Sequence, residues 1–149
     1  MIGWYPGIKQ LCKPQNRNMT QVKKKKVISL AKLKKEAWRL FSIHIRKSNA
    51  DWRGYVSCCC CGATYMWDSG LIHAGHWEHD KGDYDIRNVH PQCRNCNYKF
   101  NKNTNTAYAI FMARTYGAEE MAKIKKEVNK KGNNYTRTEL QEIITTYQP

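Results

Sequence analysis

The chain has 149 residues, a length that fits one domain with a hydrophobic core and leaves little room for a second. It carries 26 lysines and arginines against 12 aspartates and glutamates, a formal net charge of +14, and this excess indicates a polyanionic partner. No run approaches the roughly 18 apolar residues of a membrane span, and the N-terminus MIGWYPGIKQ lacks the pattern of a signal peptide, so we expect a cytoplasmic protein without a membrane partner.

The N-terminal segment 1–28 contains two prolines and a run of four lysines, and its apolar residues follow no period. We expect it to form a loosely ordered basic arm. From Ser29 onward, apolar residues recur at three- and four-residue steps with lysines and arginines largely opposite. This pattern predicts an amphipathic helix over 29–48 with Ser29 as its N-cap.

Residues 52–92 are rich in glycine, aromatic residues and short polar turns, which is typical of small strands and loops. Helical patterning returns after Cys93, and 104–149 is predicted to form helices. One helix is expected to close at Gly117 and a second to span 118–131 and end at Gly132. A third begins at a capping box made by Thr136 and Glu139. The sequence therefore predicts an α+β protein in which 29–149 is one domain and 52–103 its core.

Seven cysteines are present, and four of them are consecutive. Only two pairs have the two-residue spacing of a metal knuckle, Cys58 with Cys61 and Cys93 with Cys96. Zinc takes four thiolates in a tetrahedron, and two knuckles can join distant segments on one ion. We predict one structural zinc ion on these four residues. Redox chemistry is the alternative, although the βαβ context of a thioredoxin-like motif is absent.

The remaining cysteines have no clear role in this site. Cys59 and Cys60 occupy the spacer positions of the first knuckle, and we expect them to be passengers. The alternative is that one of them exchanges with a zinc ligand or is sensitive to oxidation. Cys12, isolated in the arm, is expected to be a free thiol.

Between the two knuckles lie four of the chain's five histidines: His73, His76, His79 and His90. Four thiolates saturate a zinc ion, so the structural site does not need these histidines. Two explanations stay open at this point. They are ordinary polar surface residues, or they surround a second, catalytic metal ion.

The order His76, Asn88, Asn97, with a CxxC pair on either side, resembles the HNH or ββα-metal nucleases in their zinc-stapled form. The stretches CGATYMWDSGLIHAGHW and YDIRNVHPQCRNCN are similar to the NinG (Rap) recombination proteins of lambdoid phages, whose pattern is roughly CxxCG, DAGH, FDERN and QCxxCN. The likeness continues through AYAIFMARTYGAEEM and YTRTELQEI. Where that family has the Asp of DAGH, this chain has His73, a neutral and softer ligand.

The resemblance implies a small zinc-stapled ββα-metal core flanked by an N-terminal amphipathic helix and C-terminal helices. It also implies a metal-dependent endonuclease that hydrolyses phosphodiester bonds in branched DNA, such as Holliday junctions and D-loops, in the cytoplasm of a bacterial host. His76 would be the general base, since histidine exchanges protons near neutral pH. Asn88 would hold the loop and orient His76. Asn97 and His73 would bind Mg²⁺ or Mn²⁺.

DNA is therefore the expected partner. The residues expected to grip its phosphates are Lys23, Lys24, Lys25, Lys26, Lys32, Lys35, Arg39, Arg94 and Lys99. Trp52, Trp67, Trp77 and Tyr98 are candidates for stacking on unpaired bases, with core packing as the alternative.

The oligomeric state and the activity leave further expectations open. Because a four-way junction is symmetric, a homodimer is expected, with Ile143, Ile144 and Tyr147 as a first candidate interface. Two other functions remain possible: a non-catalytic zinc-ribbon DNA-binding protein, and an HNH nuclease acting on linear duplex DNA.

Overall fold

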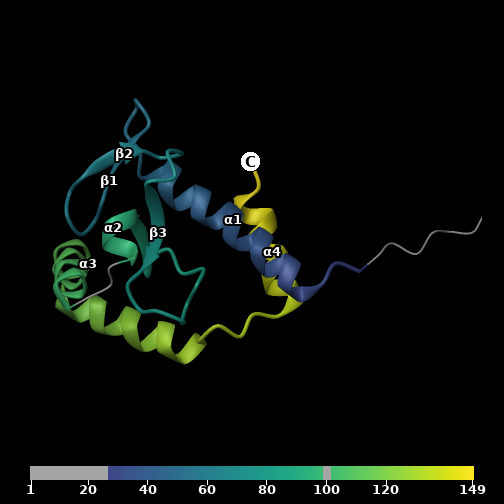
Figure 1. Ribbon diagram of the computed structural model, residues 1–149. Helices are drawn as coiled ribbons and strands as arrows, with labels where there is room; N and C mark the ends of the chain where they lie inside the picture. Colours follow the sequence, from purple (N-terminus) through teal and green to yellow (C-terminus); the bar gives the residue numbers. More distant parts are fainter. Residues whose placement is uncertain (1–26, 99–101) are drawn as a thin grey trace, which may run out of the picture.

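The computed structural model of the chain describes residues 27–98 and 102–149. Most of the expected arm, with Cys12 and Lys23 to Lys26, lies outside these residues, as does Lys99. The elements in chain order are α1 (Leu30–Ser48), β1 (Tyr55–Ser57), β2 (Thr64–Met66), β3 (Ile72–His76), β4 (Val89–Cys93), α2 (Arg94–Tyr98), α3 (Lys102–Lys131) and α4 (Arg137–Tyr147) (Figure 1). Helices combined with two small antiparallel sheets confirm the α+β prediction. None of the described helices is long and apolar enough to cross a membrane.

Helix α1 starts where the sequence predicts. Ser29 is its N-cap, and the hydroxyl accepts a hydrogen bond from the Lys32 amide. Its buried stripe consists of Leu33, Ala37, Leu40, Phe41 and Ile45. Leu33 and Ala37 pack on Leu140 of α4, whereas Phe41 and Ile45 pack on residues of β3 and β4.

Helix α4 runs beside α1 (Figure 1). It begins at the predicted capping box, in which the Thr136 side chain and the Glu139 side chain each bond the other residue's backbone amide. Its apolar residues Ile143 and Ile144 pack against the buried cluster of α1, and the Tyr147 ring lies 5.2 Å from that of Phe41. The face considered above as a dimer interface is therefore already used within the chain.

The first hairpin pairs β1 with β2, with Val56 opposite Tyr65. Its turn carries the first cysteine pair. Gly62 adopts a φ of 74°, a left-handed conformation that costs glycine little, and the Cys58 amide bonds the carbonyl of Ala63 at 2.8 Å. The main chain of the hairpin is thus folded so that both cysteines of the pair sit in one tight turn.

The second hairpin pairs β3 with β4, with His73 opposite Gln92 and His76 opposite Val89. Helix α2 follows β4 without a connecting loop, which produces a strand–strand–helix unit. The second cysteine pair begins at the last residue of β4 and ends inside α2. A main-chain hydrogen bond of 2.8 Å from the Cys59 amide to the Pro91 carbonyl joins the two hairpins.

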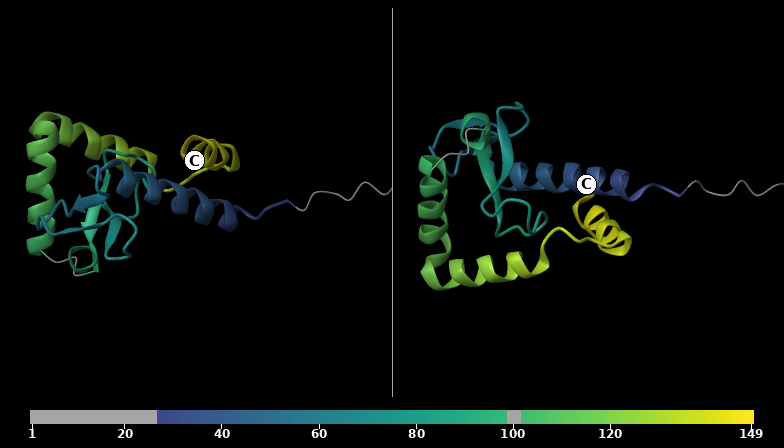
Figure 2. Two further views of the ribbon diagram at one scale, coloured as in Figure 1. Left: turned by 90° about the horizontal axis from the view of Figure 1, so that it is seen from above. Right: turned by 60° about the horizontal axis from the view of Figure 1, so that its bottom comes forward.

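Helix α3 changes direction at Gly117, where φ is 79° and ψ is 162°. Figure 2 shows its two halves as separate arms around the hairpins. Buried Tyr108 and Met112 from the first arm meet Ile124 and Val128 from the second. The helix ends before Gly132, whose φ of 58° matches the predicted termination.

Candidate functional site

The two cysteine pairs meet in space as predicted. The sulfur atoms of Cys58, Cys61, Cys93 and Cys96 all lie within 4.8 Å of one another, and Cys61 Sγ is 3.8 Å from Cys93 Sγ. Zinc–sulfur bonds of about 2.3 Å in a tetrahedron separate sulfurs by about 3.8 Å. Among the described residues, this is the only group of three or more His, Cys, Asp or Glu side chains arranged to hold a metal ion. These four cysteines can bind a zinc ion.

The protonation of these thiols links metal binding to proton release. Burial raises the pKa of Cys61 and of Cys96 above that of an ordinary thiol. A hydrogen bond with Cys60 lowers the pKa of Cys58 to about 4. Because the metal ligand is the thiolate, zinc binding displaces the protons that the raised pKa values retain.

The inner cysteines point into the protein and pack there. Gln92 Nε2 donates to Cys60 Sγ at 3.1 Å, and the Cys59 and Cys60 sulfurs are 3.7 Å apart. Both side chains contact the buried cluster on α3 that includes Tyr108. This packing fits the passenger role that the sequence predicts for them.

His73 and Asn97, the two predicted ligands of a catalytic metal, are in direct contact. Asn97 Nδ2 lies 3.1 Å from His73 Nδ1, while His73 Nε2 lies 3.2 Å from the Gly70 carbonyl oxygen. A carbonyl only accepts, so Nε2 carries the proton and Nδ1 presents its lone pair toward Asn97. Metal-binding histidines are commonly held in this way, with the second ring nitrogen donating to a carbonyl.

This pair opens into a pocket of about 270 Å³. Its far wall comes from α1, where Trp38, Ser42 and Arg46 follow one another at four-residue steps and so share one stripe of the helix. The guanidinium of Arg46 is fixed there, because Nε donates to the Ser42 carbonyl and Nη1 to the Trp67 carbonyl, each at 3.0 Å. Burial lowers the pKa of Arg46, but an arginine remains charged in a protein.

His76, the predicted base, stands at the end of β3. Its ring is stacked on Trp38 with centroids 4.9 Å apart and planes inclined by 14°. Its Nε2 atom is buried and lies 3.4 Å from a carboxylate oxygen of Asp83, without the geometry of a hydrogen bond. Since Trp38 also lines the pocket of His73 and Asn97, one indole connects the predicted base with the predicted ligands.

Asn88 is fully buried and organises the loop between β3 and β4. Its Oδ1 accepts from the Glu78 amide at 2.9 Å, and its Nδ2 donates to the Lys81 carbonyl at 2.9 Å. The Trp77 amide bonds the Asn88 carbonyl at 2.8 Å. These bonds fix the start of the segment that carries Asp83 toward His76.

His90 packs in the interior, away from this pocket. Its ring nitrogens lie 3.1 Å from the Tyr108 hydroxyl and 3.0 Å from the Tyr116 hydroxyl. Burial lowers the pKa of His90 to about 4. This histidine is therefore a neutral core residue near pH 7.

The described members of the predicted phosphate grip are all exposed. Lys32, Lys35 and Arg39 lie on the outside of α1, where Arg39 pairs with Glu36 at 2.7 Å. Arg94 lies over the ring of Tyr98, 5.7 Å from its centroid.

Sequence reasoning missed Trp38, Arg46 and Asp83. Trp38 and Arg46 had a readable signal, an aromatic and a cationic residue on one stripe of a predicted helix. Asp83 had only its place in a glycine-containing loop between His76 and Asn88. The partner of that carboxylate depends on how the loop folds.

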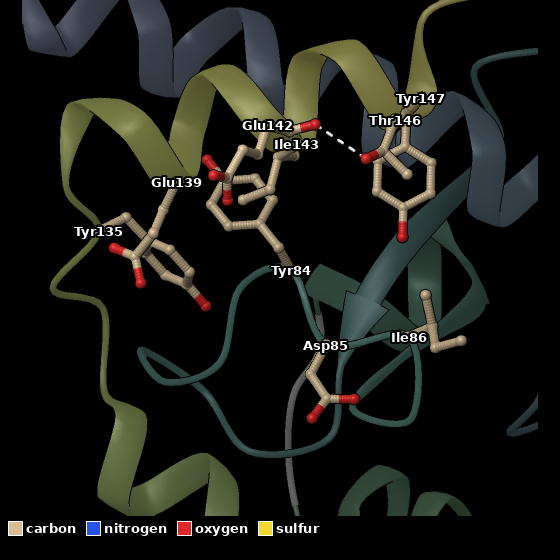
Figure 3. Close-up of a pocket in the computed structure, with 9 residues that line it drawn as sticks. All are labelled: Tyr84, Asp85, Ile86, Tyr135, Glu139, Glu142, Ile143, Thr146 and Tyr147. Atoms are coloured by element: carbon tan, nitrogen blue, oxygen red, sulfur yellow. Dashed lines mark hydrogen bonds between the residues drawn. The ribbon is translucent and has the colours of Figure 1, made fainter.

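A separate pocket of about 510 Å³ lies between the 84–86 segment and α4 (Figure 3). It is lined by the carboxylates of Asp85, Glu139 and Glu142 together with aromatic side chains. Negative charge repels phosphate, and the pocket contains none of the predicted site residues. It does not suit DNA.

The comparisons with known proteins bear on the family. Comparison with curated proteins gave no match, and comparison with solved structures gave none either. The sequence model of the family described as "Bacteriophage Lambda NinG protein" matches residues 9–149, nearly the whole chain. The two cysteine knuckles and the His76, Asn88 and Asn97 series all fall within this match. The chain therefore belongs to the NinG family.

Proposed function

We propose that this protein is a metal-dependent DNA endonuclease of phage recombination, acting on branched intermediates such as Holliday junctions and D-loops. The observation that carries the proposal is the pocket in which the Nδ1 lone pair of His73 meets Asn97, with His76 stacked on the same wall. The HNH resemblance assigns these residues to metal binding and base catalysis.

The ligand set has two protein side chains, His73 Nδ1 and the amide oxygen of Asn97. Amide nitrogen and oxygen exchange places by rotation of the side chain, so Asn97 can present its oxygen to a cation at the same point. Mg²⁺ and Mn²⁺ usually retain several waters, which suits a pair of protein ligands. Held by these two residues, such an ion would supply charge neutralisation at the scissile phosphate and at the leaving oxygen.

His76 takes the proton from the attacking water. Its Nε2 is buried and lies 3.4 Å from a carboxylate oxygen of Asp83, so Nδ1 is the nitrogen left to accept the proton. Trp38 holds the ring in one orientation by stacking. Asn88 acts one step away, by fixing the loop that brings Asp83 to the histidine.

Phosphate binding falls to cationic groups around the pocket. Arg46 is held in the pocket wall by two hydrogen bonds, so its charge is already positioned when DNA arrives. Lys32 and Lys35 continue the positive surface along α1. Contacts of this kind dominate nonspecific affinity for DNA and make it dependent on salt.

The branched substrate rests on the NinG family, and a homodimer would match the twofold symmetry of a four-way junction. Two alternatives are retained. A zinc-ribbon protein without catalysis would use the cysteine site and the charge, and an HNH nuclease of other biology would cut linear duplex.

The test is cleavage of a labelled four-way junction, a fork and a linear duplex with Mg²⁺, with Mn²⁺, or without added ion. A chelator is avoided because it would also remove zinc. We expect metal-dependent cutting with preference for the junction, and a loss of about 10²–10⁴-fold in rate for His76→Ala. His44→Ala is the control, because His44 lies on the exposed side of α1 against Tyr147.

Each outcome decides between the functions. A folded, zinc-bound His76→Ala protein that cuts at the parent rate would remove His76 as the base. Binding of all three DNAs without metal-dependent cutting would favour the zinc-ribbon alternative. Equal cutting of the three would leave a nuclease and eliminate branch selectivity.

A further inference from the structure

An aromatic pocket formed largely by α2 adjoins the His73–Asn97 pair. It has a volume of about 510 Å³, within the range of about 300–1,000 Å³ typical of small-molecule sites. Its lining residues are Tyr65, Leu71, Arg94, Asn95 and Tyr98. The Tyr98 ring stands edge-to-face against His73, with centroids 5.5 Å apart and planes inclined by 84°. A group bound in this pocket would thus lie next to the predicted metal ligand.

The pocket exposes apolar surface that the fold does not use. Tyr98 is 72% exposed and Leu71 is 45% exposed, so neither serves the core. Arg94 lies over the tyrosine ring at 5.7 Å, which adds a cation to the aromatic surface. Nucleobases stack both on tyrosine rings and on arginine guanidinium planes, and this pocket presents the two together.

The pocket is also held rigidly. Arg94 and Asn95 are the two residues between Cys93 and Cys96, so a zinc ion on the cysteines would fix both ends of their segment. The Arg94 amide bonds the Leu71 carbonyl at 2.8 Å, which ties the helix to the strand side of the pocket. Asn95 supplies an amide that can both donate to and accept from a base edge.

We propose that this pocket binds one unpaired nucleobase of the substrate, stacked on Tyr98 beside Arg94, while the neighbouring phosphate lies at His73 and Asn97. The proposal rests on the proposed nuclease function for the meaning of that phosphate. A base inside a duplex is stacked on both faces and cannot enter the pocket until it leaves the helix. The site therefore selects a phosphodiester next to an unstacked base, with little dependence on base identity, because every base has a stacking face.

The experiment measures binding without Mg²⁺ or Mn²⁺, so that cleavage plays no part. The probe is a duplex containing a single unpaired 2-aminopurine, compared with the same duplex fully paired. For the parent protein we expect tighter binding of the unpaired probe and quenching of its fluorescence. Tyr98→Ala should weaken binding of that probe by about 5- to 150-fold, the effect of one base–aromatic stack, while leaving the paired probe unchanged. Tyr98→Phe should retain both preference and quenching.

The matched control is Tyr55, an exposed tyrosine of the first hairpin that also carries an arginine over its ring. Tyr55 is 42% exposed, and Arg53 lies 5.7 Å from its centroid, the same distance as between Arg94 and Tyr98, but it is not among the residues that line this pocket. We expect Tyr55→Ala to bind both probes as the parent does. If Tyr55→Ala loses as much as Tyr98→Ala, or Tyr98→Ala keeps the preference, the pocket has no special role in binding a base.

The pocket and the nuclease can fail separately. If the protein prefers and quenches the unpaired probe but cuts no DNA, the base pocket is supported and the nuclease proposal is overturned. If the protein cuts DNA but binds the two probes equally, only the base-pocket proposal is overturned. His44→Ala should bind both probes like the parent, because His44 lies against Tyr147 and is not among the residues that line the pocket.

Discussion

The two cysteine knuckles have the same spacing, yet their spacer residues face opposite surroundings. In the first knuckle, Cys59 and Cys60 turn inward and pack against α3. In the second, Arg94 and Asn95 turn outward and line the pocket beside Tyr98. The two-residue spacing of the cysteines predicts which of them meet in space. It does not determine whether the side chains between them point into the protein or toward solvent.

The neighbouring elements account for the difference. The first knuckle sits in the β1–β2 turn, which is covered by the aromatic and aliphatic side chains of α3. The second lies where β4 becomes α2, a helix of five residues with no buried member. The first knuckle therefore contributes to the core, and the second presents its spacer side chains to an open pocket.

Both knuckles should fail together when one ligand is removed. We expect Cys93→Ala to lose the zinc ion and to unfold, because the roughly 10–16 kcal/mol of zinc binding at such sites is comparable to the whole stability of a domain. Zinc per chain by atomic emission and circular dichroism are the measurements. Cys59→Ala is the control and should keep one zinc ion. A folded, metal-free Cys93→Ala protein would contradict the structural role.

His90, on the strand β4 that leads to the second knuckle, should make the free energy of unfolding sensitive to acid. His90 is neutral when folded because burial lowers its pKa from 6.5 to about 4. Between these values the unfolded chain binds the proton more readily, so stability falls as pH drops through this window, by up to about 3 kcal/mol. Denaturant unfolding against pH measures it.

His90→Gln is the matched variant for this effect, because an amide keeps hydrogen-bonding groups and does not titrate. Release of zinc at low pH affects both proteins equally, so the difference in slope isolates the histidine. Identical slopes for the two proteins would show that His90 does not contribute.

The spacer residues of the two knuckles should differ in how much stability is lost when a larger side chain is introduced. Cys60→Leu is expected to destabilise by about 1–3 kcal/mol, because the side chain sits among Gln92 and the α3 cluster. Asn95→Leu, at the same position of the other knuckle, should change stability by no more than about 0.5 kcal/mol, because the residue is exposed. Urea denaturation of both variants gives the comparison, and equal effects would argue against it.

The smallest effect on stability is expected for Arg94→Ala. The free energy of unfolding should stay within about 0.5 kcal/mol of the parent. If the guanidinium contacts a phosphate, the magnitude of the slope of log affinity against log salt concentration should fall by about 1, the effect of losing one phosphate contact. DNA titrations at several salt concentrations measure this. An unchanged slope would limit Arg94 to stacking.

Local chemistry determined what the sequence could predict. Ser29 and Thr136 start helices because their hydroxyls cap the next turn, and Gly117 breaks a helix because it adopts a positive φ. The clustering of Cys58, Cys61, Cys93 and Cys96 followed from their spacing alone. All of these signals are contained within a few neighbouring residues.

The surroundings of the candidate site depended on contacts between distant segments. Trp38 reaches His76 only because α1 packs on β3, and no local pattern encodes that contact. Tyr98 was equally compatible with core packing and with exposure until α2 was placed. The roles of His76, Asn97 and His73 remain predictions, drawn from family resemblance and consistent with the geometry.

The bond from the Glu78 amide to Asn88 has a consequence for motion. Opening of the loop between β3 and β4 would break the side-chain hydrogen bonds of Asn88 and also the contacts of Tyr84 with α1, where its ring packs on Phe41 and its hydroxyl donates to the Lys34 carbonyl. Because this amide exchanges with solvent only when the loop opens, its hydrogen-exchange rate reports the free energy of that local opening. A slow rate would mean that the open loop is rarely populated and that Asp83 stays near His76 for nearly all of the time, so the exchange of one backbone proton would measure how well the contact between these two residues is maintained.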